Sequence, residues 1–277
     1  MENPKGILVV NHFLKTEKFN TLHGHLIESA KEAGIELALK TNLELATERP
    51  TGDFVLFWDK DVVLARRLEN EGFRVFNSSD SIRKCDNKAE TYVELLGTVP
   101  QPKTLISPLT YFKTDLHEFV TNAVGILGLP LVLKECYGSF GEGVYLCNTE
   151  KEINEIAQKI SPRPFILQQF IKEAYGCDTR LEVVGGKVVA AIERENKNDF
   201  RANLTNGGIA KPHTPTSEEC AIALTACEKL GLSFGGVDIL NGNTLCEVNS
   251  NAHIINIMNV TGVDIAPHIF ECIKTSL

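Results

Sequence analysis

The sequence predicts a mixed α/β and α+β fold, in which an open α/β lobe precedes two lobes that combine helices with antiparallel strands. Strand and helix patterns alternate in the first part of the chain, which is typical of parallel strand–helix units. Farther along, strands are joined by short turns that contain glycine, which favours antiparallel hairpins. The length of 277 residues is enough for two or three lobes that each bury a core.

The first lobe is predicted to cover residues 1–83. Residues 6–10 have the pattern of a buried strand, and residues 21–33 have apolar side chains at helical spacing. The alternation continues with strands at 35–39, 54–58 and 73–76 and a helix that runs through 62–68 and ends at Gly72. This order of elements is Rossmann-like.

Three polar residues, Asn11, His12 and Asp59, directly follow predicted strands of this lobe. The crevice beyond the strand ends of an open α/β sheet takes the ligand, so they are candidate substrate contacts. The alternative is that each caps or solvates a loop. Residues 78–87 are polar and turn-like, and we expect them to form a linker.

The second lobe is predicted to cover residues 84–168. Its expected helices lie at 88–96, 114–127 and 149–160, and its strands at 103–106, 131–136 and 144–147. Thr149 is expected to cap the last helix. Lys134 lies near the end of an otherwise apolar strand, where an unpaired ammonium group is costly, so we expect a phosphate group as its partner.

Residues 137–143 interrupt two strands of this lobe with Gly138, Gly141 and Gly143. Glycines allow backbone N–H groups to approach phosphate oxygens. The segment is neither a P-loop nor a dinucleotide-binding fingerprint, because no Gly-Lys-Ser/Thr follows and the next element is a strand. A mobile hairpin loop without a ligand is the alternative.

The third lobe is predicted to cover residues 169–277, after a strand at 165–171. Strands at 178–184 and 187–195 are joined by the Gly185-Gly186 turn, which predicts a hairpin. A polar segment at 198–208, a helix at 217–230 and a final helix at 264–274 with Pro267 in its first turn complete the lobe.

A second hairpin is predicted at residues 235–249. If its turn is centred on Gly242-Asn243, Leu240 faces Leu245, Asp238 lies opposite Glu247, and Asn249 lies on the same face as Glu247. Facing carboxylates destabilise a sheet, which a divalent cation would relieve. Two carboxylates and an amide oxygen suit Mg²⁺ or Mn²⁺. The alternative is an exposed hairpin with a solvated acidic face.

Composition excludes several classes of protein. A net charge of −8 argues against a nucleic-acid-binding surface, and no apolar run is long enough to span a membrane. The N-terminus lacks the pattern of a signal peptide. Eight cysteines are scattered without a CxxC pair, which favours reduced core residues in a cytoplasmic protein. A homo-oligomer remains open.

Several motifs together resemble the RimK-type ATP-grasp ligases, which include a glutamate ligase for a ribosomal protein. The order and spacing match from about Lys88 to Ala266, whereas the first lobe matches only as a fold type. The motifs are Lys134-Glu135-Cys136-Tyr137-Gly138-Ser139-Phe140-Gly141-Glu142-Gly143, Gly176-Cys177-Asp178-Thr179-Arg180, Val188-Val189-Ala190-Ala191-Ile192-Glu193-Arg194, Asp199-Phe200-Arg201-Ala202-Asn203 and Gly236-Val237-Asp238-Ile239-Leu240 with Glu247-Val248-Asn249.

The resemblance implies an ATP-grasp fold, in which two lobes clamp ATP, and a carboxylate–amine ligase that passes through an acyl phosphate. The implied ATP-binding residues are Lys88, Lys134, Gly138, Ser139, Gly141, Gly143, Gln169, Phe170, Ile171, Lys172, Asp178, Arg201 and Asn203. Of these, Lys134 and Arg201 are the candidate catalytic residues. The implied metal ligands are Asp238, Glu247 and Asn249, and the candidate substrate-binding residues are His12, Arg180, Arg194 and His253.

Two positions depart from the family pattern. Gln169 replaces a common Glu, and its amide oxygen still accepts a hydrogen bond from adenine. Residues 249–256 differ from the loop that borders the acceptor side in glutamate-adding relatives, which leaves the amine substrate open. An amino acid such as L-glutamate, joined to a protein, peptide or small molecule, is the leading interpretation. A kinase that phosphorylates an alcohol and a nucleotide-binding protein without ligase chemistry are the alternatives.

Overall fold

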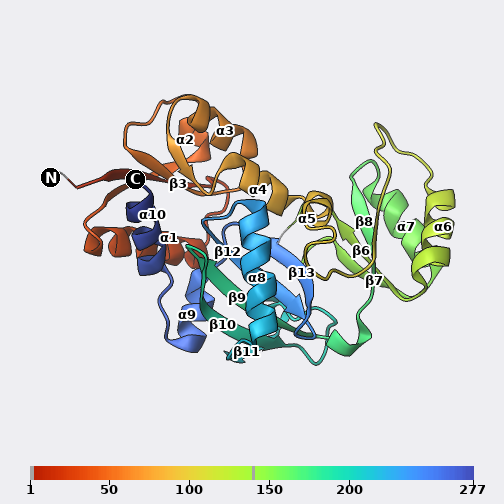
Figure 1. The fold of residues 1–277 in the computed structure, drawn as a ribbon. Helices are drawn as coiled ribbons and strands as arrows, with labels where there is room; N and C mark the ends of the chain where they lie inside the picture. The colour runs from red at the N-terminus through yellow and green to blue at the C-terminus, as the bar shows by residue number, and fades with distance from the viewer. Residues whose placement is uncertain (1–2, 139–140) are drawn as a thin grey trace.

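The computed structural model of the chain describes residues 3–138 and 141–277, which three β-sheets organise (Figure 1). One four-stranded sheet lies in the N-terminal lobe, another in the central lobe, and a five-stranded sheet in the C-terminal lobe. The C-terminal lobe lies between the other two (Figure 1). An α/β lobe followed by two α+β lobes confirms the predicted fold class.

The N-terminal sheet is parallel, with the strand order β2-β1-β3-β4. The first turn of its longest helix starts at Glu17, before the predicted start, because only one apolar residue, Phe19, packs there against the core. The elements of this lobe are β1 (Lys5–Val10), α1 (Glu17–Glu32), β2 (Glu36–Thr41), α2 (Asn42–Leu45), β3 (Phe54–Trp58), α3 (Val62–Asn70) and β4 (Arg74–Phe76).

The segment at residues 78–87, which we predicted as a linker, instead forms helix α4 (Ser79–Asp86). Ser78 caps it by accepting a hydrogen bond from a backbone N–H of the first turn, and Ile82 and Cys85 are buried. The prediction was wrong because residues that cap a short polar helix have the same composition as a turn. The boundary predicted between the first two lobes falls within α4 and remains a prediction.

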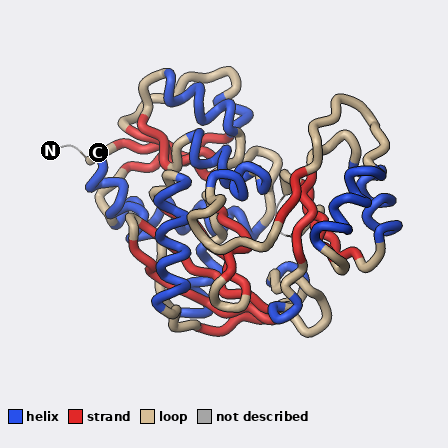
Figure 2. The backbone as a smooth tube through the Cα atoms, turned by 45° about the vertical axis from the view of Figure 1, so that its right-hand side comes forward, coloured by secondary structure: helices blue, strands red, loops and turns tan. Residues whose placement is uncertain are grey.

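The central sheet is antiparallel, with the strand order β5-β8-β6-β7. Two helices pack on one of its faces, and the second is capped by Thr149 as predicted (Figure 2). The elements are α5 (Lys88–Glu94), β5 (Thr104–Ile106), α6 (His117–Leu127), β6 (Leu131–Glu135), β7 (Val144–Cys147), α7 (Glu150–Ile160) and β8 (Phe165–Gln169). Strand β8 ends at the second predicted lobe boundary, which also remains a prediction.

The C-terminal sheet is antiparallel, with the strand order β11-β10-β9-β12-β13, and α8 crosses one face of it (Figure 1). The hairpin through Gly185-Gly186 is confirmed. Strand β11 and helix α9, which are short, were not predicted. The elements are η1 (Lys172–Ala174), β9 (Cys177–Val184), β10 (Lys187–Glu195), η2 (Leu204–Asn206), β11 (Ile209–Pro212), α8 (Ser217–Leu230), β12 (Phe234–Leu240), β13 (Thr244–Asn249), α9 (Ile254–Thr261) and α10 (Ala266–Ser276).

The hairpin of β12 and β13 pairs Asp238 with Glu247, as predicted. Leu240, however, pairs with Thr244 and not with Leu245, because the register shifts beyond Asp238. The turn contains three residues, 241–243, one fewer than expected, and the φ angles of Asn241 and Gly242 in it are 50° and 70°. Bulges of this kind re-aim side chains beside functional sites.

One apolar core joins the N-terminal lobe to the C-terminal sheet. The rings of Trp58 and Phe234 stack with centroids 5.5 Å apart, an arrangement that adds roughly 0.5–1.5 kcal/mol beyond area burial. Helices α1, α9 and α10 contribute to the same core. The core of the central lobe is separate, since its residues all come from that lobe.

Asn77 makes a polar connection between these two lobes. Its Nδ2 atom donates hydrogen bonds to the carbonyl oxygens of Phe234 and Ser250 at 2.8 and 2.7 Å. Its Oδ1 atom accepts one from the backbone N–H of Ser233 at 2.7 Å. The side chain is almost fully buried, so no water replaces these bonds.

Asn77→Ala should therefore lower the free energy of unfolding by at least about 3 kcal/mol, because each buried backbone group left unpaired costs roughly 1–3 kcal/mol. Urea unfolding measures the change. Asn20→Ala, at an exposed position of α1, is the matched control and should change stability by less than about 0.5 kcal/mol. Equal effects of the two substitutions would contradict the role of Asn77.

Candidate active site

A cleft between the central and C-terminal lobes brings most of the predicted site residues together. Those that line it are Lys88, Lys134, Gly138, Gly141, Gln169, Phe170, Ile171, Asp178, Arg194, Arg201, Asn203, Asp238 and Glu247. Among the described residues, Gly143, Lys172 and Asn249 do not belong to this lining. Ser139 lies outside the described residues.

Lys134 projects into this cleft from strand β6 and is only 8% exposed. Its Nζ atom lies 3.8 Å from the Sγ atom of Cys246, a residue that sequence analysis gave no role. No carboxylate in the described part of the chain forms an ion pair with it. A buried ammonium group without an anionic partner is costly, so the cleft fits a ligand with negative charge at this point. The phosphates of a nucleotide have that charge.

Lys88 lies at the start of α5, on the same side of the cleft. Its Nζ atom donates a hydrogen bond to the carbonyl oxygen of Gly138 at 3.2 Å and lies 3.5 Å from the Glu247 carboxylate. Lys88 therefore contacts both the glycine-containing segment and the C-terminal sheet.

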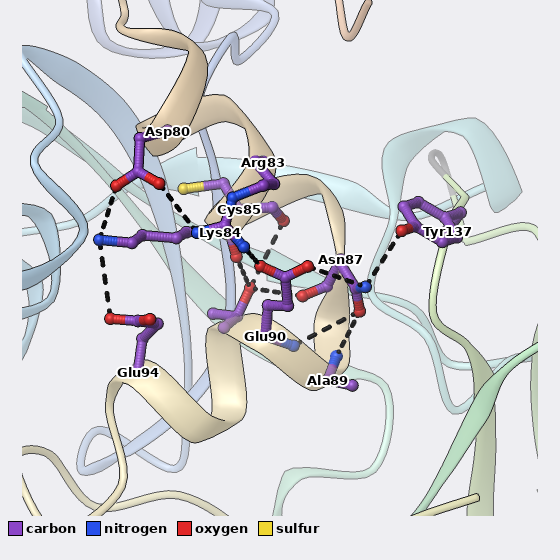
Figure 3. A network of polar contacts seen from close by, with 10 residues as sticks. Asp80, Arg83, Lys84, Cys85, Asn87, Ala89, Glu90, Glu94 and Tyr137 are labelled. Carbon is purple, nitrogen blue, oxygen red and sulfur yellow. Dashed lines mark hydrogen bonds and ion pairs between the residues drawn. The ribbon is translucent and has the colours of Figure 1, made fainter. Parts of the chain in front are cut away.

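A network of polar contacts fixes α5 and hence Lys88 (Figure 3). Asn87 caps the helix through its Oδ1 atom and donates from Nδ2 to the Tyr137 hydroxyl at 3.2 Å. Arg83 of α4 forms an ion pair with Glu90 of α5. The connection between α4 and α5 thus also holds the residue that begins the glycine-containing segment.

Four charged side chains form a continuous ion-pair ladder across β10, β9 and β12. Arg194 donates two hydrogen bonds of 2.6 Å to Asp178 and also lies 3.1 Å from Asp238. Arg180 donates two hydrogen bonds of 2.7 Å to the same Asp238 carboxylate. We name these residues, Asp178, Arg194, Asp238 and Arg180, the ion-pair ladder.

The ladder changes the expected electrostatics of Asp238. Burial opposes ionisation of its carboxyl group, but Arg180 and Arg194 outweigh burial and lower its pKa to about 2. For Glu247, burial is likewise outweighed, here by Lys88 and then Lys134, and its pKa is lowered. Cationic side chains from other elements thus already compensate the facing carboxylates, so their pairing alone does not require a divalent cation.

The carboxylates of Asp238 and Glu247 nevertheless suit the binding of a divalent cation in addition to their cationic neighbours. A carboxylate has about four lone-pair sites, and the bonds from Arg180 and Arg194 use only part of those on Asp238. Within the described ranges, no group of three or more His, Cys, Asp or Glu side chains could hold a metal ion. The predicted set has only two such side chains, because its third member is the amide of Asn249. This metal site therefore remains a prediction.

Several apolar side chains also line the cleft. Phe170 follows β8, and its ring packs edge-to-face against Phe200 with centroids 6.5 Å apart. Val132, Val144 and Leu240 complete the wall, although sequence analysis singled out none of them. Gln169 is at the exposed end of β8. A flat aromatic ligand suits such a surface.

Arg201 connects the polar segment after β10 to the glycine-containing segment. It forms a two-point ion pair with Asp199 and donates a hydrogen bond to the carbonyl oxygen of Gly141 at 2.8 Å. Gly141 has a φ of +79°, and a Cβ atom there would lie 3.0 Å from Nδ2 of Asn206. Glycine is therefore required for this close approach.

A second pocket adjoins the first and shares Arg194 and Asn203 with it. Lys18 of α1, Arg180, Glu182 and His253 also line it. Burial lowers the pKa of His253 to about 4, so this imidazole is neutral at pH 7. Residues 249–256, expected to be a loop, end in helix α9.

His12 is not in either pocket. Its ring lies 3.2 Å from Lys15, and its backbone N–H donates to Asn42. Asn11 donates hydrogen bonds to the carboxylate of Asp59, which satisfies both side chains within the N-terminal lobe. These contacts favour the alternative that Asn11, His12 and Asp59 stabilise loops and do not contact substrate.

Residues 86–273 match the family described as RimK-like ATP-grasp domain. The chain belongs to this family. It is 33% identical over 281 residues to a protein named probable alpha-L-glutamate ligase from Methanococcoides burtonii, covering 91% of this chain and 90% of the relative.

Two solved structures have the same ATP-grasp fold. A RimK domain ATP-grasp protein from Sphaerobacter thermophilus is 22% identical with a TM-score of 0.72, covering 97% of this chain and 99% of that one. D-alanine–D-alanine ligase from Bacillus anthracis, complexed with ATP, is 15% identical with a TM-score of 0.77, covering 100% and 97%.

The RimK-like ATP-grasp protein is thus an enzyme of a family of ATP-dependent carboxylate–amine ligases, as its motifs indicate. Members of this family use ATP with Mg²⁺ or Mn²⁺. Throughout residues 3–138 and 141–277, no helix is long and apolar enough to cross a membrane.

The ladder predicts that Asp238→Asn destabilises the ligand-free protein by about 3–5 kcal/mol, because the loss of a partner leaves buried guanidinium charge uncompensated. Urea unfolding in the presence of EDTA measures this. Glu193→Gln on β10 is the matched control. It removes a partly exposed pair with Lys211 at 3.1 Å and should cost less than about 1 kcal/mol. A rise in the stability of Asp238→Asn would show instead that carboxylate repulsion dominates.

Proposed function

We propose that this protein uses ATP to convert a carboxylate into an acyl phosphate and then joins it to an amine, with release of ADP and phosphate. The amine is an amino acid such as L-glutamate, and the acceptor is a protein, a peptide or a small molecule. The observation that carries this proposal is the buried ammonium group of Lys134, which forms no ion pair with a described residue, in a cleft that adjoins a second polar pocket.

In this proposal the cleft binds ATP along its length. Lys88 and Lys134 bind the phosphates, under the segment from Gly138 to Gly143. Residues 169–172 contact adenine and Asp178 lies on the ribose side, next to the apolar wall. Positive charge around the phosphoryl oxygens is what phosphoryl transfer requires from a protein.

Asp238, Glu247 and Asn249 would hold Mg²⁺ or Mn²⁺, which when bound neutralises charge on the phosphates. Arg201 and Asn203 are proposed to lie beside the transferred phosphoryl group. Arg201 also holds the carbonyl oxygen of Gly141, so its position couples phosphate binding to the conformation of the glycine-containing segment.

The proposed reaction needs no nucleophilic side chain, because the acyl phosphate is itself an activated electrophile. The thiols agree with this. Burial raises the pKa of Cys136 and Cys147 to about 11 and that of Cys227 to about 12, so these groups are protonated at neutral pH. They act as core residues.

Lys134→Met should raise the Kd for ATP with Mg²⁺ by at least about tenfold, since a charge-assisted contact contributes roughly 1.5–3 kcal/mol. Titration calorimetry measures the Kd. Lys151→Met is the matched control, because Lys151 is exposed on α7 and should leave ATP binding unchanged. An unchanged Kd in Lys134→Met would remove the basis of the nucleotide assignment.

The reaction type is tested by its products. ADP and phosphate should appear together only when a carboxylate and an amine are both present, and hydroxylamine should trap the activated carboxylate as a hydroxamate. Mass spectrometry with a panel of amino acids and cell-extract peptides identifies the pair. AMP with pyrophosphate would indicate an adenylating enzyme, and a stable phosphorylated alcohol would indicate a kinase. Absence of turnover in every mixture would favour the binding protein without chemistry.

A further inference from the structure

The second pocket contains a buried carboxylate that the proposed reaction has not used. Glu182 lies on β9 between the ladder and α9, is 3% exposed, and lines this pocket with Lys18, Arg180 and Arg194. In the described part of the chain, no hydrogen bond or ion pair joins its carboxylate to another residue. The two guanidinium groups nearby already bind Asp238 and Asp178.

The backbone makes room for this carboxylate. Gly236 of β12 pairs with Glu182, and a Cβ atom at Gly236 would lie 3.0 Å from Oε1 of Glu182. A larger residue would push against the carboxylate or against Ala252, which would lie 2.9 Å away. The glycine therefore allows the Glu182 carboxylate to lie over β12.

Burying a carboxylate without a cationic partner is costly, as it is for the ammonium group of Lys134 in the neighbouring cleft. Burial raises the pKa of Glu182 to about 7, even though Arg180 and Arg194 nearby oppose the shift. A ligand with a positive group would offset the cost of burial. Lys134 and Glu182 are thus opposite charges that form no ion pair within the described ranges, in two adjoining pockets.

We propose that Glu182 binds the ammonium group of the amine substrate, so that the second pocket recognises the zwitterionic end of an α-amino acid. This inference rests on the proposed function, and it assigns the specificity for the amine substrate to Glu182.

The charges around the pocket favour a zwitterion over a simple cation or anion. Three cations, Lys18, Arg180 and Arg194, face three anions, which are Glu182 and the two ladder carboxylates, while His253 is neutral. Their formal charges sum to zero before the ligand enters, although the Glu182 carboxylate forms no hydrogen bond or ion pair with a described residue. A ligand end that carries one charge of each sign preserves that balance, with its ammonium group on Glu182 and its carboxylate toward the cations.

The test compares amino acids with their deamino analogues. Titration calorimetry in the presence of AMP-PNP and Mg²⁺ is carried out with the standard α-amino acids, and the tightest binder is compared with the same molecule without its amino group, such as L-glutamate with glutarate. The wild type should bind the amino acid at least about tenfold more tightly. In Glu182→Gln this preference should fall below about threefold.

Matched controls separate recognition from folding. Glu193→Gln should retain the full preference, and Glu182→Gln should retain its affinity for AMP-PNP, because Glu182 does not line the nucleotide cleft. Glu182→Asp keeps the charge and should keep part of the preference. If Glu182→Gln does not fold, the preference for the amino acid over its deamino analogue, measured in the wild type and in Glu182→Asp, still tests the inference.

Equal binding of amino acid and analogue by the wild type, no binding of any α-amino acid, or an unchanged preference in Glu182→Gln would each overturn the inference. Failure of the proposed function is a different result, namely a wild type that forms neither ADP nor hydroxamate in any mixture. The proposed function and the role of Glu182 are both supported by one result. Glu182→Gln should still form hydroxamate from hydroxylamine, but its KM for the amino acid should rise at least about tenfold, which corresponds to about 1.4 kcal/mol.

Discussion

The ion-pair ladder is the interaction on which the arrangement of both pockets depends. In the register of the sheet, Arg194 lies opposite Asp178 and Arg180 lies opposite Asp238, so the charged groups meet only when β10, β9 and β12 are aligned as observed. A shift of one residue would turn these side chains to the other face of the sheet and leave them unpaired. Because Arg194 lines both pockets, the ladder also fixes their relative position.

The ladder residues are ion-paired, whereas Lys134 and Glu182 are not, so these two residues say more about the ligands of the pockets. Paired residues such as Asp178 contribute to structure whether or not a ligand is present. Lys134 and Glu182 instead are buried without an ion pair to a described residue, and the arginines near Glu182 offset its burial only in part. Their opposite signs match the two ligands of the proposed ligase, a polyphosphate and an amino acid, and the pockets adjoin where those ligands would react.

Sequence patterns predicted the elements and motifs better than the interactions between them. The pairing of Asp238 with Glu247 followed from a local glycine turn, whereas the arginines that neutralise Asp238 come from strands far away in the sequence. No local pattern shows such pairing, so a metal was inferred to relieve a repulsion that the arginines already relieve. Helix α4 was missed for a related reason, since its capping residues resemble a turn.

The distribution of apolar cores separates the two pockets mechanically. The second pocket is lined by α1 of the N-terminal lobe and by the C-terminal sheet. These two parts share one apolar core and are connected by the hydrogen bonds of Asn77. The cleft lies between the central lobe and the C-terminal lobe. The core beneath the central sheet is separate, but Leu95 and Val99, at and after the end of α5, pack into the core of the C-terminal sheet. The central sheet with α6 and α7 is therefore the part that shares no apolar core with the C-terminal lobe, whereas α5 is held against it. A movement of that sheet alone would widen the cleft and leave the ladder, Glu182 and Arg194 in place.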